Sequence, residues 1–340
     1  MIRQGAFELV ASTSAASSPS RKIRRLGIAV LAVVALYSAG WYYVASEFEA
    51  FLGRFLNKDS NGVTLECGNL ATGGFPFLIG FTCDRTGIDD PGTGSRAAAG
   101  PFRAAARIYN PGAAIVELEG PADFVLPDGS TIEARWSSLR SSLHASLSGL
   151  NHLSLQGDEP ALRLNAVMLY EPFDFRARQG ELHLRNQNGD LDMAAIARDF
   201  EWKLASGEAV LPRLSTSADL RLDGRGELLS GQPANLRPAS GELRSFRIET
   251  ADGLYGEMSG PFTIDAEGLI SGTFRTTFEK IDMWDTTLRR LFPGAGDTIS
   301  ALAALLKGLA KGEDRVTVNL KVDRGLITLS LLPLGRIPPL

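Results

Sequence analysis

The sequence predicts a mainly β protein: an N-terminal transmembrane helix, then a large curled antiparallel sheet with a short helical segment near the C-terminus. Three observations predict this. An apolar stretch without charged residues occupies residues 26–45. After it, short runs alternate apolar and polar residues with period two, which is typical of strands with one apolar face. Dipeptides that accept positive φ stand between these runs, namely Asn61-Gly62, Asp128-Gly129, Asn188-Gly189, Asp223-Gly224 and Asp252-Gly253.

Composition narrows the class of protein. With 340 residues, 44% of them hydrophobic, the chain is long enough for a sizeable core. The formal net charge is -4, so the chain has no excess of basic residues to attract nucleic-acid phosphates. We therefore expect no nucleic-acid partner. The 36 Gly and 17 Pro follow no fixed period, as in proteins of many short strands.

Residues 26–45 are predicted to span a membrane once. A helix of this length rises about 30 Å, the thickness of the hydrocarbon core. Four basic residues lie in 21–25, whereas Glu47 and Glu49 follow the stretch. The positive-inside rule therefore predicts a cytoplasmic N-terminus and an exported C-terminal domain.

A cleaved signal peptide is the alternative for this segment, because Ser38-Ala39-Gly40 offers small residues to a peptidase. The apolar stretch exceeds the usual hydrophobic region of about 7–15 residues, which favours a retained anchor. The following domain is translocated in both cases.

The anchor is flanked by two short predicted segments. Residues 1–25 are predicted to be a disordered cytoplasmic tail, since the serine-rich first twenty are poor in apolar residues. Residues 46–60 are predicted to form a helical stalk, because apolar side chains recur there at helical spacing. These are Phe48, Phe51, Leu52 and Phe55.

Cys67 and Cys83 both follow the span, in a compartment where disulfides persist. A hairpin turning near residues 73–76 would place the two thiols opposite each other across two strands. The bond would constrain the unfolded chain by about 3 kcal/mol. A metal or redox site is less favoured, since the spacing is not CxxC and no histidine is near. A pair of free thiols is the remaining alternative.

Residues 61–340 are predicted to be the exported β-rich domain. Residues 131–150 fit a helix or a strand, and their serine content favours strand. The helical segment is expected at 282–311, broken at Pro293-Gly294, with its second helix starting near Asp297 or Thr298. Strands at 316–320 and 326–331 are expected to close the domain.

Motifs for chemistry are missing from the sequence, so we expect no enzyme, catalytic residue, metal ligand or cofactor. The scattered histidines favour surface or edge positions, and the acidic pairs favour solvated turns. Arginines that alternate with apolar residues favour a polar sheet face; contact with anionic lipid headgroups or an acidic partner is the functional alternative. The residues concerned are His144, His152, His183, Asp89-Asp90, Asp158-Glu159, Asp190, Asp192, Glu313-Asp314, Arg135, Arg163, Arg176, Arg178 and Arg185.

One motif resembles a known family. Gly74, Phe75, Pro76 and Phe77 precede Cys83, after an early single span and before an Asp-Gly turn upstream of Trp136. This combination is similar to the bacterial envelope family called domain of unknown function 2125, from about residue 25 onward. The resemblance implies a single-pass protein of the bacterial inner membrane with a periplasmic C-terminal domain, and no assigned activity.

The C-terminal third resembles, more loosely, AsmA-like proteins. The stretches concerned are 251–260, 265–272, 324–327 and 337–340. AsmA-like proteins are single-span inner-membrane proteins whose long curled sheets are thought to carry lipid, so the resemblance implies a lipid-binding interior.

These observations lead to two functional hypotheses. The first is a membrane-anchored, non-enzymatic periplasmic β protein that holds a lipid or other hydrophobic ligand in an apolar groove. The second is an anchored scaffold or assembly factor for other envelope proteins, bound along a sheet edge. Expected partners are therefore the bilayer, a lipid and envelope proteins. A β-sandwich with an ordinary closed core would show the same alternation.

Overall fold

The computed structural model describes residues 21–56, 62–146, 149–167, 171–207, 209–230, 237–330 and 332–339. The chain divides into two compact units, Met1–Glu47 and Phe48–Leu340, and each is treated by itself.

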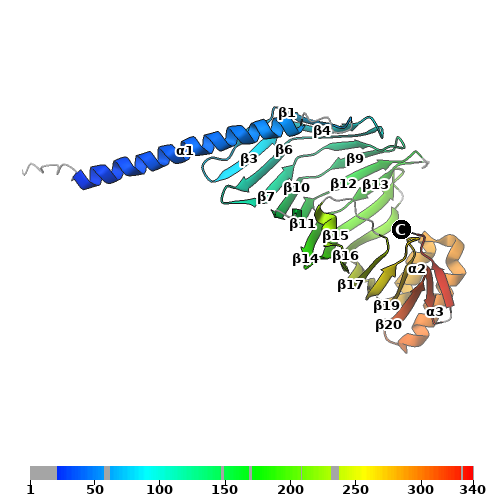
Figure 1. The fold of residues 1–340 in the computed structure, drawn as a ribbon. Coiled ribbons are helices and arrows are strands. Elements are labelled where there is room, and N and C mark those ends of the chain that lie inside the picture. Colours follow the sequence, from blue (N-terminus) through cyan, green and yellow to red (C-terminus); the bar gives the residue numbers. More distant parts are fainter. Residues whose placement is uncertain are drawn as a thin grey trace, which may run out of the picture. The chain divides into compact units, whose positions relative to one another are not determined.

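The first element is one long helix, α1 (Arg21–Leu56) (Figure 1). It begins five residues before the predicted span, so residues 21–25, expected in the tail, are helical, because Arg and Lys are good helix formers. Its length and apolar composition suit a membrane anchor or a signal sequence. Residues 46–56 of the expected stalk belong to it. Residues 1–20 and 57–60 of the predicted tail and stalk lie outside the described residues.

Most of the rest of the described chain forms one large antiparallel sheet that does not close on itself, which confirms the predicted fold class. In its N-terminal part, two consecutive strands form the two halves of one bent strand. A bend of one to three residues separates the two halves. These bent strands are β1 (Thr64–Gly68) with β2 (Ala71–Gly73), β3 (Leu78–Cys83) with β4 (Arg85–Asp90), β5 (Ser95–Ala99) with β6 (Phe102–Arg107), β7 (Asn110–Leu118) with β8 (Ala122–Val125), β9 (Thr131–Arg135) with β10 (Ser138–Ser146), β11 (Gly149–Asp158) with β12 (Ala161–Asn165), and β13 (Phe173–Arg176) with β14 (Gln179–Gln187).

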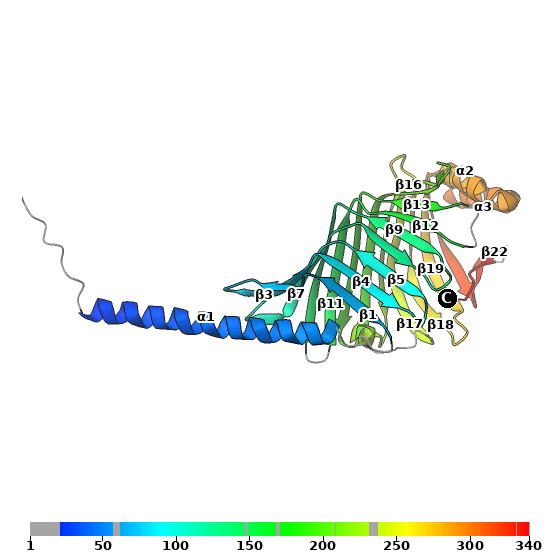
Figure 2. The same ribbon diagram turned by 90° about the horizontal axis from the view of Figure 1, so that it is seen from above.

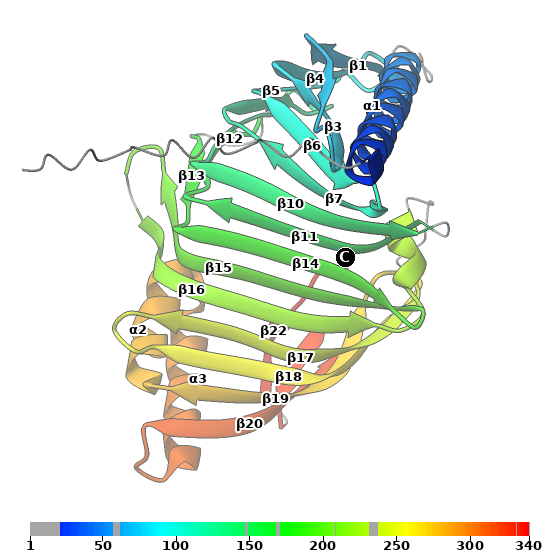
Figure 3. The ribbon, with the colours of Figure 1, turned by 90° about the vertical axis from the view of Figure 1, so that its left-hand side faces the viewer.

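The bends divide this part of the sheet into two walls. The first wall has the order β1, β4, β5, β8, β9, β12, β13. The second wall has the order β2, β3, β6, β7, β10, β11, β14. Both walls end on one strand, β15 (Asp190–Leu204), which pairs with β14 through residues 190–198 and with β13 through residues 201–204. Figures 2 and 3 show the strands of the two walls from two directions.

Local chemistry explains where the strands bend. Pro101, Pro121 and Pro160 stand in three of the bends, where the missing N–H interrupts the ladder. Glu159 and Asp199 have positive φ, 51° and 52°, which turns the backbone at those points.

The bends also change which sequence positions are apolar. In β11 the apolar positions are odd, Leu153 and Leu155, but in β12 they are even, Leu162 and Leu164. The register places apolar residues opposite both pairs: Leu184 and Leu182 of β14 in the second wall, and Ala134 and Ile132 of β9 in the first. The shift by one residue at the bend therefore keeps the apolar face on the same side of a strand that changes direction.

Beyond β15 the sheet continues as a meander of β16 (Ala209–Leu222), β17 (Ala239–Thr250), β18 (Tyr255–Ile264), β19 (Ile270–Glu279), β20 (Arg315–Asp323), β21 (Leu326–Leu329) and β22 (Leu332–Arg336). Asn188 and Gly189, with φ of 56° and 93°, form the predicted tight turn between β14 and β15. The expected hairpin at Asp223-Gly224 is different: β16 leads there into a 3-10 helix, η1 (Gly226–Ser230).

A helical layer lies beside the end of the sheet (Figure 1). It comprises α2 (Ile281–Leu291), the 3-10 turn η2 (Pro293–Ala295) and α3 (Gly296–Ala310). These elements match the helical segment predicted at 282–311 and its break at Pro293-Gly294. The predicted cap at Asp297 or Thr298 is wrong: Ala295 is the N-cap and makes no side-chain bond, since η2 runs directly into α3.

Two other predictions concern strands. The strand interpretation of 131–150 is confirmed by β9, β10 and the start of β11, with residues 147–148 outside the described residues. β22 was not predicted. It contains Pro333, which an edge strand tolerates because the ladder does not need its N–H.

Candidate functional site

The inner face of the first wall carries continuous apolar rows. Residues directly opposite each other on successive strands form each row. One row is Leu65, Ile88, Ala97, Phe124, Ile132, Leu164 and Phe173. The next is Cys67, Thr86, Ala99, Ala122, Ala134, Leu162, Phe175 and Trp202. Only Thr86 interrupts the apolar character.

These rows are only partly buried: Ala122 and Ala134 are covered, but larger side chains stay exposed. Ile88, Leu162 and Phe124 keep 48%, 42% and 37% of their surface exposed. A closed core would bury such side chains almost completely. These partly exposed rows therefore line an open groove between the two walls, which we call the trough.

The first hollow of this trough has a volume of about 340 Å³ and lies between the walls. Leu65, Ile88 and Phe124 line it from the first wall, and Phe81 and Phe102 line it from the second. The two rings of the second wall are in contact, with centroids 5.4 Å apart.

The last turns of α1 that belong to the sheet unit pack at this end of the trough. Phe48 lies 6.3 Å from Phe81 between ring centroids, and Thr72 Oγ1 donates to Glu49 at 2.8 Å. Leu52 is buried and Leu56 lines the first hollow. Of the residues noted at helical spacing in the sequence, Phe48 and Leu52 pack on the sheet, whereas Phe51 is 56% exposed.

The second hollow is larger, about 560 Å³, and lies on the inner face of the C-terminal meander. One charged residue, Arg237, lines it, and the other lining residues are apolar. These are Met193, Leu220, Leu222, Ala239, Leu243, Met258, Phe262, Ile264, Ile270, Phe274, Leu320, Val322, Ile327 and Ile337. Ligand pockets in proteins have comparable volumes and linings, about 300–1,000 Å³.

A smaller hollow, about 180 Å³, adjoins the second one and shares Met258 and Leu320 with it. Trp284 of α2 lines it, with its indole N–H donating to the Tyr255 carbonyl at 3.0 Å. The helical layer therefore borders the C-terminal end of the trough.

Cys67 and Cys83 form a disulfide with a Cα–Cα distance of 5.1 Å. The predicted hairpin turn after β2 is present, but the two cysteines do not face each other across that hairpin. Cys67 lies opposite Thr86 and Cys83 opposite Phe102. Because the strand bends at Asn69, the bond joins a strand of the first wall to one of the second.

The Gly74-Phe75-Pro76-Phe77 motif forms the loop between β2 and β3. Gly74 has φ of 114° and accepts a hydrogen bond from the Leu78 N–H at 2.9 Å. Phe77 is 64% exposed, and its carbonyl accepts from Ile108 N–H, beside the 73% exposed Tyr109. The motif and the β6–β7 turn are thus neighbours at one end of the second wall, and each carries an exposed aromatic residue.

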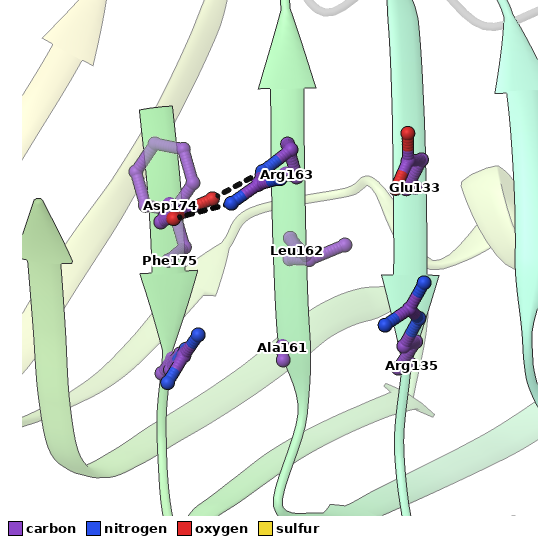
Figure 4. A pocket seen from close by; sticks show the side chains of 8 residues that line it. Glu133, Arg135, Ala161, Leu162, Arg163, Asp174 and Phe175 are labelled. Atoms are coloured by element: carbon purple, nitrogen blue, oxygen red, sulfur yellow. Dashed lines mark hydrogen bonds and ion pairs between the residues drawn. The ribbon is translucent and has the colours of Figure 1, made fainter. Parts of the chain in front are cut away.

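The outer face of the walls is polar and ion-paired. Figure 4 shows Arg163 of β12 holding Asp174 of β13 with two hydrogen bonds, 2.8 and 2.9 Å, near Glu133 and Arg135. The hydrogen bond from Arg163 lowers the pKa of the Asp174 carboxyl. Arg178 pairs with Asp199 through one contact, from Nε to Oδ2 at 2.5 Å. This placement fits the interpretation of the alternating arginines as a polar sheet face.

Asp192 is the most enclosed carboxylate of this face. It accepts from Arg185 at 3.0 Å and from Arg244 at 2.6 Å. Burial acts to raise the pKa of Asp192, but the two arginines outweigh it, so the pKa lies below its ordinary value. Asp192 of β15 therefore forms ion pairs with β14, through Arg185, and with β17, through Arg244.

The three histidines, scattered in the sequence, come together on this outer face. His144 and His152 stack at 5.6 Å between ring centroids, and His183 Nδ1 lies 2.8 Å from Ser154 Oγ. Burial and the neighbouring His144 lower the pKa of His152. Among the described residues, no group of three or more His, Cys, Asp or Glu is placed to hold a metal ion.

Comparison with known proteins gives one match. The family model described as "Uncharacterized protein conserved in bacteria (DUF2125)" matches residues 41–338. No curated protein and no solved structure matches the chain. The likeness to AsmA-like proteins stays a prediction.

Proposed function

Because the chain belongs to DUF2125, a bacterial family of uncharacterized proteins, we propose its function from its geometry: it is a membrane-anchored binding protein that holds a lipid or another hydrophobic ligand in its trough. The observation that carries this proposal is the incomplete burial of the apolar inner rows. Contiguous exposed apolar surface in a folded protein marks a ligand groove or an interaction surface.

The energetics favour an apolar occupant. Each Å² of apolar surface removed from water contributes about 25 cal/mol, and the lining of both hollows is almost entirely apolar. An acyl chain would bury surface on both sides of the trough at once. The apolar rows also cross many neighbouring strands, so an extended acyl chain could lie along them.

The residues that line the second hollow support binding rather than catalysis. They offer no carboxylate, imidazole or hydroxyl to a reacting group. The three histidines lie on the outer face, away from the apolar rows, since His144 and His152 alternate with the inward Leu143 and Leu153. We therefore propose a non-enzymatic role.

We place the sheet unit in the periplasm, with α1 in the inner membrane. The basic residues before the apolar stretch support a cytoplasmic N-terminus, and the disulfide suits an oxidising compartment. The expected span ends at Ala45, three residues before Phe48, so chain length keeps the start of the sheet unit within reach of the bilayer.

The test is to fill the trough without disturbing the core. Ala195 is exposed in an inner row, between Leu182 and Ala218, whereas Ala194 points to the outer face opposite His183. Native mass spectrometry of the full chain in detergent should show co-purified lipid in the wild type and in Ala194→Trp. Ala195→Trp should lose most of it. Equal lipid in both variants, or none in the wild type, contradicts the proposal.

The free edges of the sheet support a second candidate, an anchored scaffold or assembly factor for envelope proteins. Within the described residues β1, β2 and β22 each lack a partner strand on one side. These edges are short, and β22 contains Pro333 and Gly335, features that discourage strand addition. A stoichiometric protein partner in the same mass spectra, without lipid, would favour this candidate.

A further inference from the structure

We propose that the second hollow takes an anionic acyl amphiphile, with Arg237 binding its carboxylate or phosphate head and the apolar rows holding its chain. This inference rests on the proposed function and names the chemical class of the ligand. It follows from the place of one guanidinium in an otherwise apolar lining.

Arg237 stands where β17 is about to begin, two residues before Ala239. Its side chain lines the hollow and is also exposed to solvent. A long arginine side chain of this kind lays its methylene stem along apolar surface and keeps its head in water. The head of a bound ligand would therefore lie at the rim, with its chain directed inward.

Arg237 has no hydrogen-bond acceptor or carboxylate partner among the described residues. Many arginines of the outer face are paired with Asp or Glu, as Arg163 is with Asp174. Asp223, near the start of β17, already accepts from Arg221 Nε at 3.2 Å and from Ser240 Oγ at 2.9 Å. A bound anion would therefore give Arg237 the ion-pair partner that the described residues do not provide.

A second guanidinium adds positive charge at this corner. Arg225 donates from Nη2 to the carbonyl of Pro238, the residue after Arg237. Its Nε is buried without a hydrogen-bond partner among the described residues. Both arginines favour an anion here over a neutral or cationic head.

The chemistry discriminates between ligands that differ only in the head. A guanidinium forms two parallel, charge-assisted hydrogen bonds with a carboxylate or phosphate, and it gains far less from an alcohol. The apolar walls bind the chains of both ligands equally well. We therefore expect binding to be stronger for the anion by about tenfold or more.

The experiment uses photo-crosslinking of the full chain, reconstituted in nanodiscs of zwitterionic lipid. The probes are a diazirine-bearing C16 fatty acid and the fatty alcohol with the same chain. The readout is adduct formation, against probe concentration, on the tryptic peptide 248–275, which carries the lining residues Met258, Phe262 and Phe274. The acid should label this peptide at about one tenth of the concentration that the alcohol requires.

The matched variants are Arg237→Gln and Arg135→Gln. Arg135 is an exposed arginine beside the outer-face pair of Figure 4, outside the trough. The first variant should bring labelling by the acid down to that of the alcohol, and the second should leave the preference unchanged. Arg237→Lys, which keeps the charge but loses the two-point geometry, should give an intermediate preference. It also serves as the second variant if Arg237→Gln fails to fold.

The source of the ligand is identified by two further probes. Diazirine-bearing phosphatidylglycerol and phosphatidylcholine share their chains, and only the first has a net negative head. Preference for the fatty acid alone points to free fatty acid, and preference for phosphatidylglycerol as well points to acidic phospholipid. Acid and alcohol labelling equally in the wild type overturns this inference but leaves the proposed function standing. No labelling of the peptide by any probe overturns both.

Discussion

The two ends of the sheet use the same alternation in opposite ways. In the first wall the inward rows contain alanine and large side chains such as Ile88 and Leu162 that stay nearly half exposed. At the C-terminal end, α2 and α3 cover part of the sheet, and Ile281, Leu306 and Val316 are buried in one cluster. Period-two alternation therefore predicts which face of a sheet is apolar. Whether that face becomes a buried core or an open groove depends on whether another layer covers it.

The largest expected effect separates these two ends directly. Leu306 is 4% exposed in the helical cluster, whereas Leu162 is 42% exposed in the first wall. Leu306→Ala should lower the free energy of unfolding by about 2–5 kcal/mol, because it leaves a cavity. Leu162→Ala should lower it by about 0.5 kcal/mol or less. Urea unfolding of the full chain in detergent measures both, and equal losses would remove the distinction between core and groove.

The next effect concerns how the open end is held together without a core. The double variant Cys67→Ser, Cys83→Ser releases a loop with a sequence separation of 16 residues that links the two walls. It should lower the free energy of unfolding by about 3 kcal/mol. Wild-type protein in reductant should match it. Because Leu306 is in another region, adding Leu306→Ala should give an additive loss; no loss in the double variant would show that the open end needs no cross-link.

A smaller effect is expected at the loop of the second wall. A Cβ at Gly74 would lie 2.7 Å from the Leu78 carbonyl oxygen, at a φ of 114°. Gly74→Ala should therefore cost about 1–3 kcal/mol of stability. A Cβ at Gly73 would meet nothing within 4 Å, and the φ there is ordinary, so Gly73→Ala is the control and should be nearly neutral. Thermal unfolding of both variants tests this, and similar melting temperatures would contradict it.

The smallest effect depends on pH and tests the outer face that both regions share. The folded-state pKa of Asp192 is lowered, so its stabilising contribution is present above the unfolded-state pKa, about 3.9, and is lost as the pH falls through the folded-state pKa. Asp192→Asn should be less stable than wild type by about 1–2 kcal/mol at pH 7. The gap should shrink below about pH 4. Urea midpoints between pH 3 and 7 measure it, with Asp219→Asn, a half-exposed partner of Arg244, as the control.

Much of this architecture could be predicted from residue patterns. The apolar stretch gave the long helix, alternation gave the antiparallel strands, and Pro293-Gly294 gave the break between α2 and α3. The division into two walls was missed, although a signal was present. The apolar positions change from odd to even between Leu155 and Leu162, and such a phase shift within one long alternating run indicates a bend.

The candidate site was less predictable, since it depends on contacts between distant residues. Arg237 and Met193 line one hollow only because the meander curls, and nothing in local sequence encodes that curvature. The pairing of Cys67 with Cys83 was predicted, but with the wrong strand geometry, because the bend at Asn69 was not foreseen. The clustering of the histidines likewise follows from strand register alone.

Each bent strand contributes one segment to each wall, and this has a consequence for how such proteins vary in size. Inserting one bent hairpin between β12 and β13 would add two strands to both walls and lengthen the trough by about 10 Å, at a strand spacing of about 4.8 Å. The junction on β15 and the helical layer would be unaffected, because neither pairs with the inserted strands. The reach of the protein is therefore a modular property, adjustable by duplication while its two ends are preserved.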